Sequence, residues 1–133
     1  MGQPAANASS TVTAVDTHIV MVPSPGGPVP TPLPHPFSGQ FGGGLVNTVK
    51  IGGQPAAVVG SIANAQPPHL PTPPGTSFQK PPANQGSVFI GSMSVKIGGQ
   101  QAARNGDPVK TCNDPADIPV GQIIAVGTVM IGG

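Results

Sequence analysis

Short runs in which apolar and polar residues alternate are the main pattern of this chain, and they predict β-strands. The clearest run is Val-x-Ile, which occurs at residues 49–51, 95–97 and 129–131. A period of two is typical of a strand with one buried face. Each run is followed by two glycines, which can adopt the positive φ that a two-residue hairpin turn needs. With no helical periodicity between these runs, the pattern predicts an all-β fold of short hairpins.

A longer repeat joins each of these strands to a second one. Residues 49–60 read VKIGGQPAAVVG and residues 95–106 read VKIGGQQAARNG, while a shorter copy, VMIGG, occupies residues 129–133. Three similar units in one chain predict approximate threefold symmetry inside a single domain. We expect that domain to cover residues 1–133, with residues 1–15 as a candidate flexible segment and no appended domain.

Two proline-rich segments separate the predicted hairpins. Residues 23–36 and residues 67–82 each contain seven prolines. Proline lacks a backbone N–H donor and has a fixed φ, so neither segment is expected to form a central strand. Polyproline linkers, or ligands for aromatic grooves, are one interpretation. Each segment also holds a histidine among its prolines, His35 and His69, and this favours ordered loops.

Composition and charge narrow the classes of function. The 133 residues include 20 Gly and 19 Pro, but also 15 Val and 9 Ile, which favour strands over disorder. The net charge is +1, whereas a nucleic-acid surface needs clustered Lys and Arg. The absence of Glu excludes Glu-dependent acid–base chemistry. The sequence shows neither a run of about 18 apolar residues nor a secretory signal, so if the protein leaves the cell we expect another machine to carry it; the resemblance described below implies synthesis in the bacterial cytoplasm and export as part of that machine.

Three histidines and one cysteine are the candidate metal ligands: His18, His35, His69 and Cys112. A tetrahedral Zn²⁺ takes four nitrogen or sulfur ligands, and Fe²⁺ also suits such a mixture, whereas Ca²⁺ and Mg²⁺ prefer oxygen. One cysteine cannot form an internal disulfide, and a small domain needs a staple. We predict one structural zinc per chain, with iron as the second choice. The alternative is a chance inventory, since short metal-finger spacings are absent.

The remaining polar residues have simpler interpretations. Asp107 and Asp114 precede prolines and are typical of turns, and we expect Asp16 and Asp117 to be turn or cap residues as well. No catalytic signature surrounds Cys112, so a nucleophilic role is not expected.

The repeats resemble the Pro-Ala-Ala-Arg element that names the PAAR-repeat proteins. Residues 100–107 read QQAARNGD, and residues 54–60 read QPAAVVG with Val58 in place of the arginine. Residues 86–91 and 127–132 resemble the glycine-bounded strands of the same family. The resemblance runs from about Asp16 to the C-terminus.

Membership of that family implies a small pseudo-threefold β-cone that caps the spike of a contractile injection apparatus. The apparatus would be a type VI secretion system or a phage-tail-like particle, and the long proline loops and Val58 favour the latter. By position, the resemblance implies that His18, His69 and Cys112 bind a metal, typically zinc, near the tip of the cone. His35 lies in an insertion longer than the family pattern.

The implied protein is a structural puncturing tip and not an enzyme, because four protein ligands leave no metal position for water. We expect a monomer that binds a trimeric β-helical spike (VgrG-like or phage-spike-like) as one chain per trimer. Other expected partners are effector cargo and, transiently, the target membrane, but not nucleic acid. The predicted spike contacts are Ile51, Ala56, Ala57, Ile97, Ala102, Ala103 and Ile131.

Two other functions remain open at this point. A metalloenzyme could use the same cluster with water in place of one ligand, although no Glu or Lys lies nearby to act as a general base. A proline-rich interaction module could dock residues 30–34 onto aromatic grooves.

Overall fold

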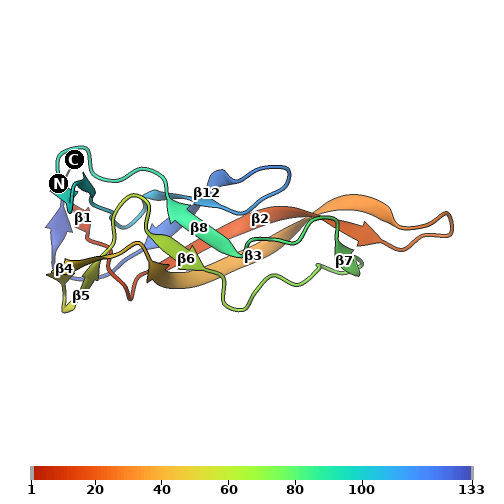
Figure 1. Cartoon of the computed structure of the whole chain (residues 1–133), viewed down its shortest axis with the longest axis horizontal. Helices are drawn as coiled ribbons and strands as arrows, with labels where there is room; N and C mark the ends of the chain where they lie inside the picture. Colours follow the sequence, from red (N-terminus) through yellow and green to blue (C-terminus); the bar gives the residue numbers. More distant parts are fainter. Residues whose placement is uncertain (1, 133) are drawn as a thin grey trace.

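The computed structural model describes residues 2–132, and within this range the chain forms strands, turns and bends but no helix. The predicted all-β class is therefore confirmed. Across the same residues there is consequently no helix that is long and apolar enough to span a membrane. The molecule is elongated, with both chain termini at one end and a long β-hairpin at the other (Figure 1).

Six antiparallel strands close into a small barrel. In pairing order they are β12 (Ile118–Ile124), β11 (Pro108–Thr111), β8 (Gln85–Val88), β6 (Ile62–Asn64), β3 (Val29–Gly43) and β2 (Thr11–Val22). Pairing of β2 with β12 closes the sheet, with Val12 opposite Ile123. The two-residue strand β7 (Ser77–Phe78) adds to β2 beyond the barrel, at Val20 and Met21.

Small, β-branched and aromatic side chains fill the barrel. Val12, Val109 and Ile123 are fully buried, and Phe37 and Phe41 lie among them. Inward and outward residues alternate along each strand, as the pleat requires. The main hydrophobic core therefore lies inside this barrel.

Three short pairs of antiparallel strands form the end of the molecule that holds the termini, and we call this end the base (Figure 1). Strand β4 (Val46–Ile51) pairs with β5 (Gln54–Ala56), and β9 (Lys96–Ile97) pairs with β10 (Gln100–Gln101). Each turn is a Gly-Gly pair with φ of 59° and 85°, which confirms these two predicted hairpins. The third pair is not a hairpin, because β13 (Met130–Ile131) pairs with β1 (Gln3–Pro4) from the other end of the chain.

Strand β1 of this third pair belongs to a further copy of the repeat, which was not predicted from the sequence. Residues 3–6 read QPAA, like residues 54–57, and residues 100–103 read QQAA. Ala5 is 3% exposed and Ala6 is fully buried. Residues 2–15 are therefore part of the fold, in contrast to the flexible segment expected there; Met1, also in that expectation, lies outside the described residues.

Backbone hydrogen bonds join the three Ala-Ala pairs in a ring. The N–H of Ala6 donates to the C=O of Ala103 (2.9 Å), Ala103 donates to Ala57 (3.0 Å), and Ala57 donates to Ala6 (3.1 Å). Alanine is suited to these positions because a larger side chain would hold the three backbones apart. The ring ties together segments from the start, the middle and the end of the chain.

The turn after each Ala-Ala pair is also the same. The N–H groups of Asn7, Val58 and Arg104 each donate to a side-chain oxygen three residues later, and those oxygens belong to Ser10, Ser61 and Asp107 respectively. The ring bonds and these turn bonds are therefore each made three times, once by each repeat.

The residues that were expected to contact a spike mostly pack inside the base. Ala56, Ala57, Ala102 and Ala103 have no exposed surface, because the ring encloses them. Ile51 and Ile131 are buried in a second apolar cluster, against which Ile97 packs with part of its surface exposed. Of the seven residues, six are therefore buried in the isolated chain, and Ile97 is the one with a partly exposed surface.

Residues 29–36 form a strand, where the sequence analysis expected a loop. The register of β3 on β2 sets Pro30, Pro32 and Pro34 opposite Met21, Ile19 and Thr17. In an antiparallel pair, alternate residues direct their N–H groups away from the partner strand, so prolines at these positions remove no hydrogen bond of the ladder. No other strand of the described chain pairs with this part of β3, which is therefore an edge, where proline is tolerated.

Candidate metal centre

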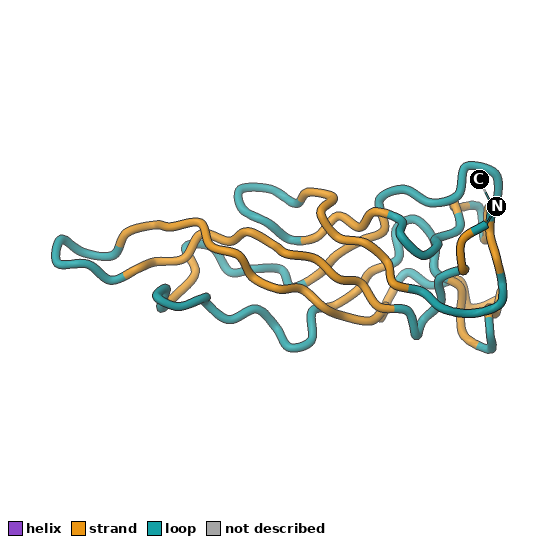
Figure 2. Tube along the Cα trace, turned by 180° about the vertical axis from the view of Figure 1, so that it is seen from behind, coloured by secondary structure: helices purple, strands orange, loops and turns teal. Residues whose placement is uncertain are grey.

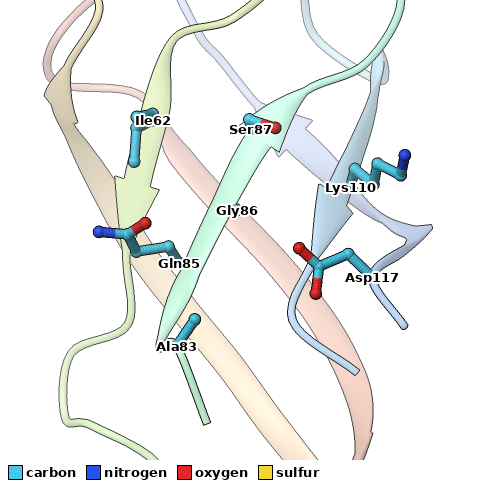
Figure 3. Close-up of a pocket in the computed structure, with 7 residues that line it drawn as sticks. All are labelled: Ile62, Ala83, Gln85, Gly86, Ser87, Lys110 and Asp117. Atoms are coloured by element: carbon cyan, nitrogen blue, oxygen red, sulfur yellow. The ribbon is translucent and has the colours of Figure 1, made fainter. Parts of the chain in front are cut away.

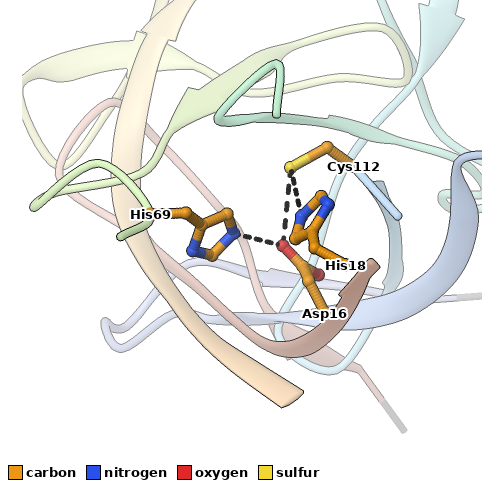
Figure 4. A group of neighbouring side chains, drawn as sticks. All are labelled: Asp16, His18, His69 and Cys112. Atoms are coloured by element: carbon orange, nitrogen blue, oxygen red, sulfur yellow. Dashed lines mark hydrogen bonds and ion pairs between the residues drawn. The ribbon is translucent and has the colours of Figure 1, made fainter. Parts of the chain in front are cut away.

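Four buried side chains meet inside the chain at the end of the barrel away from the base (Figure 4). They are Asp16, His18, His69 and Cys112, and one ligand atom from each lies within 4.8 Å of the others. The residues are between 0% and 7% exposed. Their donor atoms are a carboxylate oxygen, two imidazole nitrogens and a sulfur, a set that could hold a metal ion.

Asp16 and His18 lie on the inward face of β2. Val12 and Val20, which share that face, are fully buried, since residues an even number of positions apart in a strand point the same way. Asp16 is thus a strand residue with no exposed surface, and our assignment of it to a turn or cap was wrong. The signal for it was present in the sequence, because Asp16 and His18 interrupt the apolar alternation of a buried strand face.

The carboxylate of Asp16 is oriented through one of its two oxygens. Oδ1 accepts hydrogen bonds from the hydroxyl of Thr111 and from the amide of Asn113 (3.4 Å). Oδ2 faces the cluster, 2.8 Å from His69 Nε2 and 3.6 Å from Cys112 Sγ. One oxygen is therefore held in place while the other points to the candidate ligands.

Cys112 follows β11, and the two residues after it are hydrogen-bonded to β2. The N–H of Thr17 donates to the side chain of Asn113 (2.6 Å), and the N–H of Asp114 donates to the C=O of Thr17 (2.8 Å). These contacts set Cys112 Sγ 3.6 Å from His18 Nε2.

Burial, and secondarily the Asp16 carboxylate, raises the pKa of the Cys112 thiol to about 11. Without a cation the thiol is therefore neutral and donates a hydrogen bond to Asp16 Oδ2. Because the thiolate is the form that ligates metals, binding of a cation would release this proton.

The second ring nitrogen of His18 faces Asp114. His18 Nδ1 is buried without a hydrogen-bond partner among the described residues, and Asp114 Oδ2 lies 3.4 Å away. That oxygen also accepts the N–H of Ile19 (2.9 Å). A carboxylate at this place orients an imidazole whose other nitrogen ligates a metal. Burial lowers the pKa of His18 in spite of Asp114, so the ring is neutral at pH 7 and Nε2 can donate a lone pair.

The distances within the cluster fit a transition metal. Zinc–ligand bonds of about 2.0–2.3 Å place the ligand atoms of a tetrahedral site roughly 3.3–3.8 Å apart. Both Cys112 Sγ distances, 3.6 Å to His18 Nε2 and 3.6 Å to Asp16 Oδ2, lie in that range. The 2.8 Å contact between Asp16 and His69 is a hydrogen bond that ligation would replace. The thiol and the imidazoles favour zinc or iron over calcium or magnesium.

His35 packs directly against two of these four residues. Its ring centroid is 5.3 Å from that of His18 and 5.7 Å from that of His69, close to the 5.0 Å between the His18 and His69 rings themselves. Of the four ligands predicted from the sequence, the structure brings together His18, His69 and Cys112, and it adds Asp16 in the place expected for His35.

The cluster does not lie at the extreme end of the molecule, although the prediction put the metal near the tip. The β2–β3 hairpin continues past it, from Ile19 opposite Pro32 to Val22 opposite Val29. Figure 2 shows these two strands projecting beyond the other strands.

A separate groove lies on the outside of the barrel, beside β6, β8 and β11 (Figure 3). Gln85, Lys110 and Asp117 stand around it. Lys110 is exposed, whereas Thr111, the next residue of β11, is buried on the opposite face beside Asp16. The groove is therefore separated from the cluster by the sheet, and its lining includes no histidine or cysteine.

No protein-family model matches the chain, and no curated protein or solved structure matches it. Its function is therefore inferred from its own residues and geometry.

Proposed function

We propose that this chain is the tip protein of a contractile injection apparatus, with its base seated on a trimeric β-helical spike. The observation that carries the proposal is the ring of hydrogen bonds among Ala6, Ala57 and Ala103, in which one chain makes the same contacts three times. The end of a trimeric spike presents three equal faces, and a single chain can match them only by repeating its own surface. The resemblance to PAAR-repeat proteins supports the same function.

The shape of the chain also supports this proposal. Three short strand pairs lie at the base, the barrel follows, and the β2–β3 hairpin forms the opposite end (Figure 1). We infer that this is the cone of the PAAR family, with a pseudo-threefold axis along its length and the β2–β3 hairpin as the point.

The hairpin end suits contact with a target membrane. Residues 19–34 contain no charged side chain. The turn is closed by a hydrogen bond from the Gly27 N–H to the C=O of Ser24 (3.0 Å). Because an isolated charge is costly in hydrocarbon, an uncharged hairpin is favoured at a point that must pass through a bilayer.

The metal in this proposal is structural. Asp16, His18, His69 and Cys112 would hold it, and a bound zinc ion, or iron as the second choice, would cross-link the segments that carry them. This matters in a chain whose single cysteine is free. With four protein ligands, no open position is left for a reacting water, so we propose no enzymatic activity.

The metal is tested by elemental analysis of the chain purified without chelators. We expect one equivalent of zinc or iron. Cys112→Ser should lose the metal and melt at lower temperature, because structural zinc contributes on the order of 10 kcal/mol to the folding of small domains. A wild-type chain without stoichiometric transition metal would overturn the proposed site, as would a Cys112→Ser protein with unchanged metal content and melting temperature.

The capping function is tested by native mass spectrometry with a co-expressed spike. We expect a monomer alone and one chain per spike trimer. Ile97→Glu should weaken capping, because the new charge would be desolvated against the spike. Ser77→Glu, exposed on β7 far from the base, is the control, and circular dichroism verifies that both variants fold. Three chains per trimer, or full capping by a folded Ile97→Glu protein, would contradict the proposal.

A further inference from the structure

We propose that the alternating prolines of β3 close the exposed edge of the projecting hairpin to strand addition, so that this hairpin cannot pair with a second copy of the chain. The proposal goes beyond the proposed function, because it depends neither on a bound metal nor on a spike. It follows from the two edges of the hairpin that β2 and β3 form beyond the metal cluster (Figure 2).

The edge formed by β2 is covered by two other segments. The N–H of Ile19 donates to the side chain of Asp114 (2.9 Å), and the C=O of Ile19 accepts the N–H of Gln79 (2.9 Å). The C=O of Met21 accepts the N–H of Thr76 (3.0 Å). The backbone groups of Ile19 and Met21 therefore point away from β3 and take no part in the ladder between the two strands.

The register of the hairpin then fixes where the prolines of β3 point. Pro32 lies opposite Ile19, and Pro30 lies opposite Met21. In an antiparallel pair, two residues that lie opposite each other both direct their backbone groups toward the partner strand or both direct them away from it. Pro30 and Pro32 therefore face the outer edge, as does Pro34, whose C=O accepts a threonine hydroxyl from another segment (2.7 Å).

The edge formed by β3 offers acceptors but no donors. In the described part of the chain, residues 29–36 pair with no strand other than β2, and Pro30, Pro32, Pro34 and Pro36 are exposed. An added antiparallel strand needs both an N–H and a C=O at every second residue of the edge. Because proline supplies only the C=O, an incoming strand would lose half of these hydrogen bonds and leave its own C=O groups unpaired.

The other usual protections are missing from this edge. Proteins commonly guard an edge strand with charged side chains or with a covering segment. Residues 19–34 contain no charged side chain, and Val29 at the start of β3 is 48% exposed. An uncharged strand without prolines has the properties of a segment that self-associates. The prolines are therefore the feature that keeps this edge unpaired.

The test is the double variant Pro30→Thr/Pro32→Thr. It gives the edge two neighbouring donors and leaves the ladder with β2 unchanged, because no N–H is used at these positions. We expect the variant to fold, as judged by circular dichroism, and to self-associate at least tenfold more tightly than the wild type in analytical ultracentrifugation. Val29→Thr is the matched control. Its N–H already faces Val22 across the ladder, so the edge gains no donor and the protein should stay monomeric.

Hydrogen exchange of the two new amides identifies the surface that associates. We expect the N–H groups of residues 30 and 32 in the double variant to exchange slowly only at concentrations at which it self-associates. A folded double variant that stays monomeric would overturn the proposal, as would an oligomer in which these two N–H groups exchange freely.

Folding of the variants is the remaining control. If only the double variant fails to fold, Pro32→Thr alone is measured in the same way. If the double variant and both single variants fail to fold, the proposal is also overturned, because the prolines would then serve the folding of the hairpin and not its edge. None of these outcomes bears on metal content or on capping, so the proposed function is tested separately.

Discussion

Burial makes the polar residues of the cluster depend closely on one another. Asp16 has no exposed surface, and its partners are neutral donors together with His69 and the Cys112 thiol. A buried carboxylate is costly without compensation, and a buried thiolate beside it would be more so. A divalent cation removes both penalties at once, because it pairs with the carboxylate and the thiolate together. The arrangement is therefore better balanced with an ion than without one.

We expect Asp114 to raise the affinity of the cluster for a metal without being a ligand itself. Replacing it with Asn keeps an acceptor for the Ile19 N–H but removes the charge beside His18 Nδ1. We expect Asp114→Asn to bind one equivalent of zinc with an affinity about 10–100-fold lower, as for other carboxylates that support a ligating histidine. Competition with a chelator of known affinity measures this. The matched control is Asp117→Asn in the same loop, where the carboxylate is exposed; equal affinity in both variants would contradict the role of Asp114.

Two buried histidines should make the metal-free chain sensitive to acid. Burial lowers the pKa of both His18 and His35 below 6.5 in the folded chain. As pH falls below about 6.5, the unfolded chain therefore binds protons before the folded chain does, and stability decreases. Each histidine contributes a slope of up to about 1.4 kcal/mol per pH unit between its folded pKa and 6.5. Above that window these two histidines contribute no further pH dependence.

Urea unfolding of the chelated chain at pH 5.5, 6.5 and 7.5 measures this dependence. His35→Gln should show a shallower decrease, because one of the two histidines whose pKa is lowered by folding is then absent. A chain that becomes more stable as the pH falls from 6.5 to 5.5 would show that these rings gain, and do not lose, proton affinity on folding.

At the scale of strands, the local elements were predictable and their partners were not. The Gly-Gly hairpins β4–β5 and β9–β10 follow from residues within one short window, since alternation and the positive φ of the glycines act locally. Closure of the barrel pairs Val12 with Ile123, and no local signal specifies a contact across that distance in the chain. The strand at residues 29–36 was missed because prolines usually exclude strands, and here the register places them where no N–H is used.

Gly39 shows how closely two of the barrel strands approach. A Cβ at this position of β3 would collide with the backbone carbonyl of Asn64. We expect Gly39→Ala to destabilise the chain by about 1–3 kcal/mol, because the backbone atoms in contact cannot move aside without distorting the sheet. Gly26→Ala in the hairpin turn is the control, since nothing lies within 4 Å of its added Cβ. Urea unfolding measures the free energy of unfolding of both variants. Equal values for Gly39→Ala and Gly26→Ala would contradict this account.

At the scale of the whole molecule, the base is closed by the two ends of the chain. The third strand pair sets Gln3 opposite Ile131, so its two strands come from opposite ends of the sequence. This explains why residues 3–6 were not recognised as a repeat: the Val-x-Ile-Gly-Gly run that precedes the other two copies lies at the far end of the chain. Three of the four candidate metal ligands follow from residue type alone, whereas Asp16 depends on which face of β2 turns inward.

If the N-terminal segment is a true third repeat, its alanine must be as constrained as those of the other two. Ala6, Ala57 and Ala103 are all fully buried and make equivalent hydrogen bonds in the ring. Leucine at any of them would force the ring apart, and overpacking of this kind costs about 1–3 kcal/mol. We therefore expect Ala6→Leu, Ala57→Leu and Ala103→Leu to lower the free energy of unfolding by similar amounts, whereas Ala116→Leu, on an exposed bend, should have little effect. Urea titrations of the four variants measure this. The contrary outcome is an Ala6→Leu protein as stable as the wild type while Ala57→Leu and Ala103→Leu are destabilised. It would mean that the N-terminal segment does not contribute to the stability of the ring as the other two repeats do.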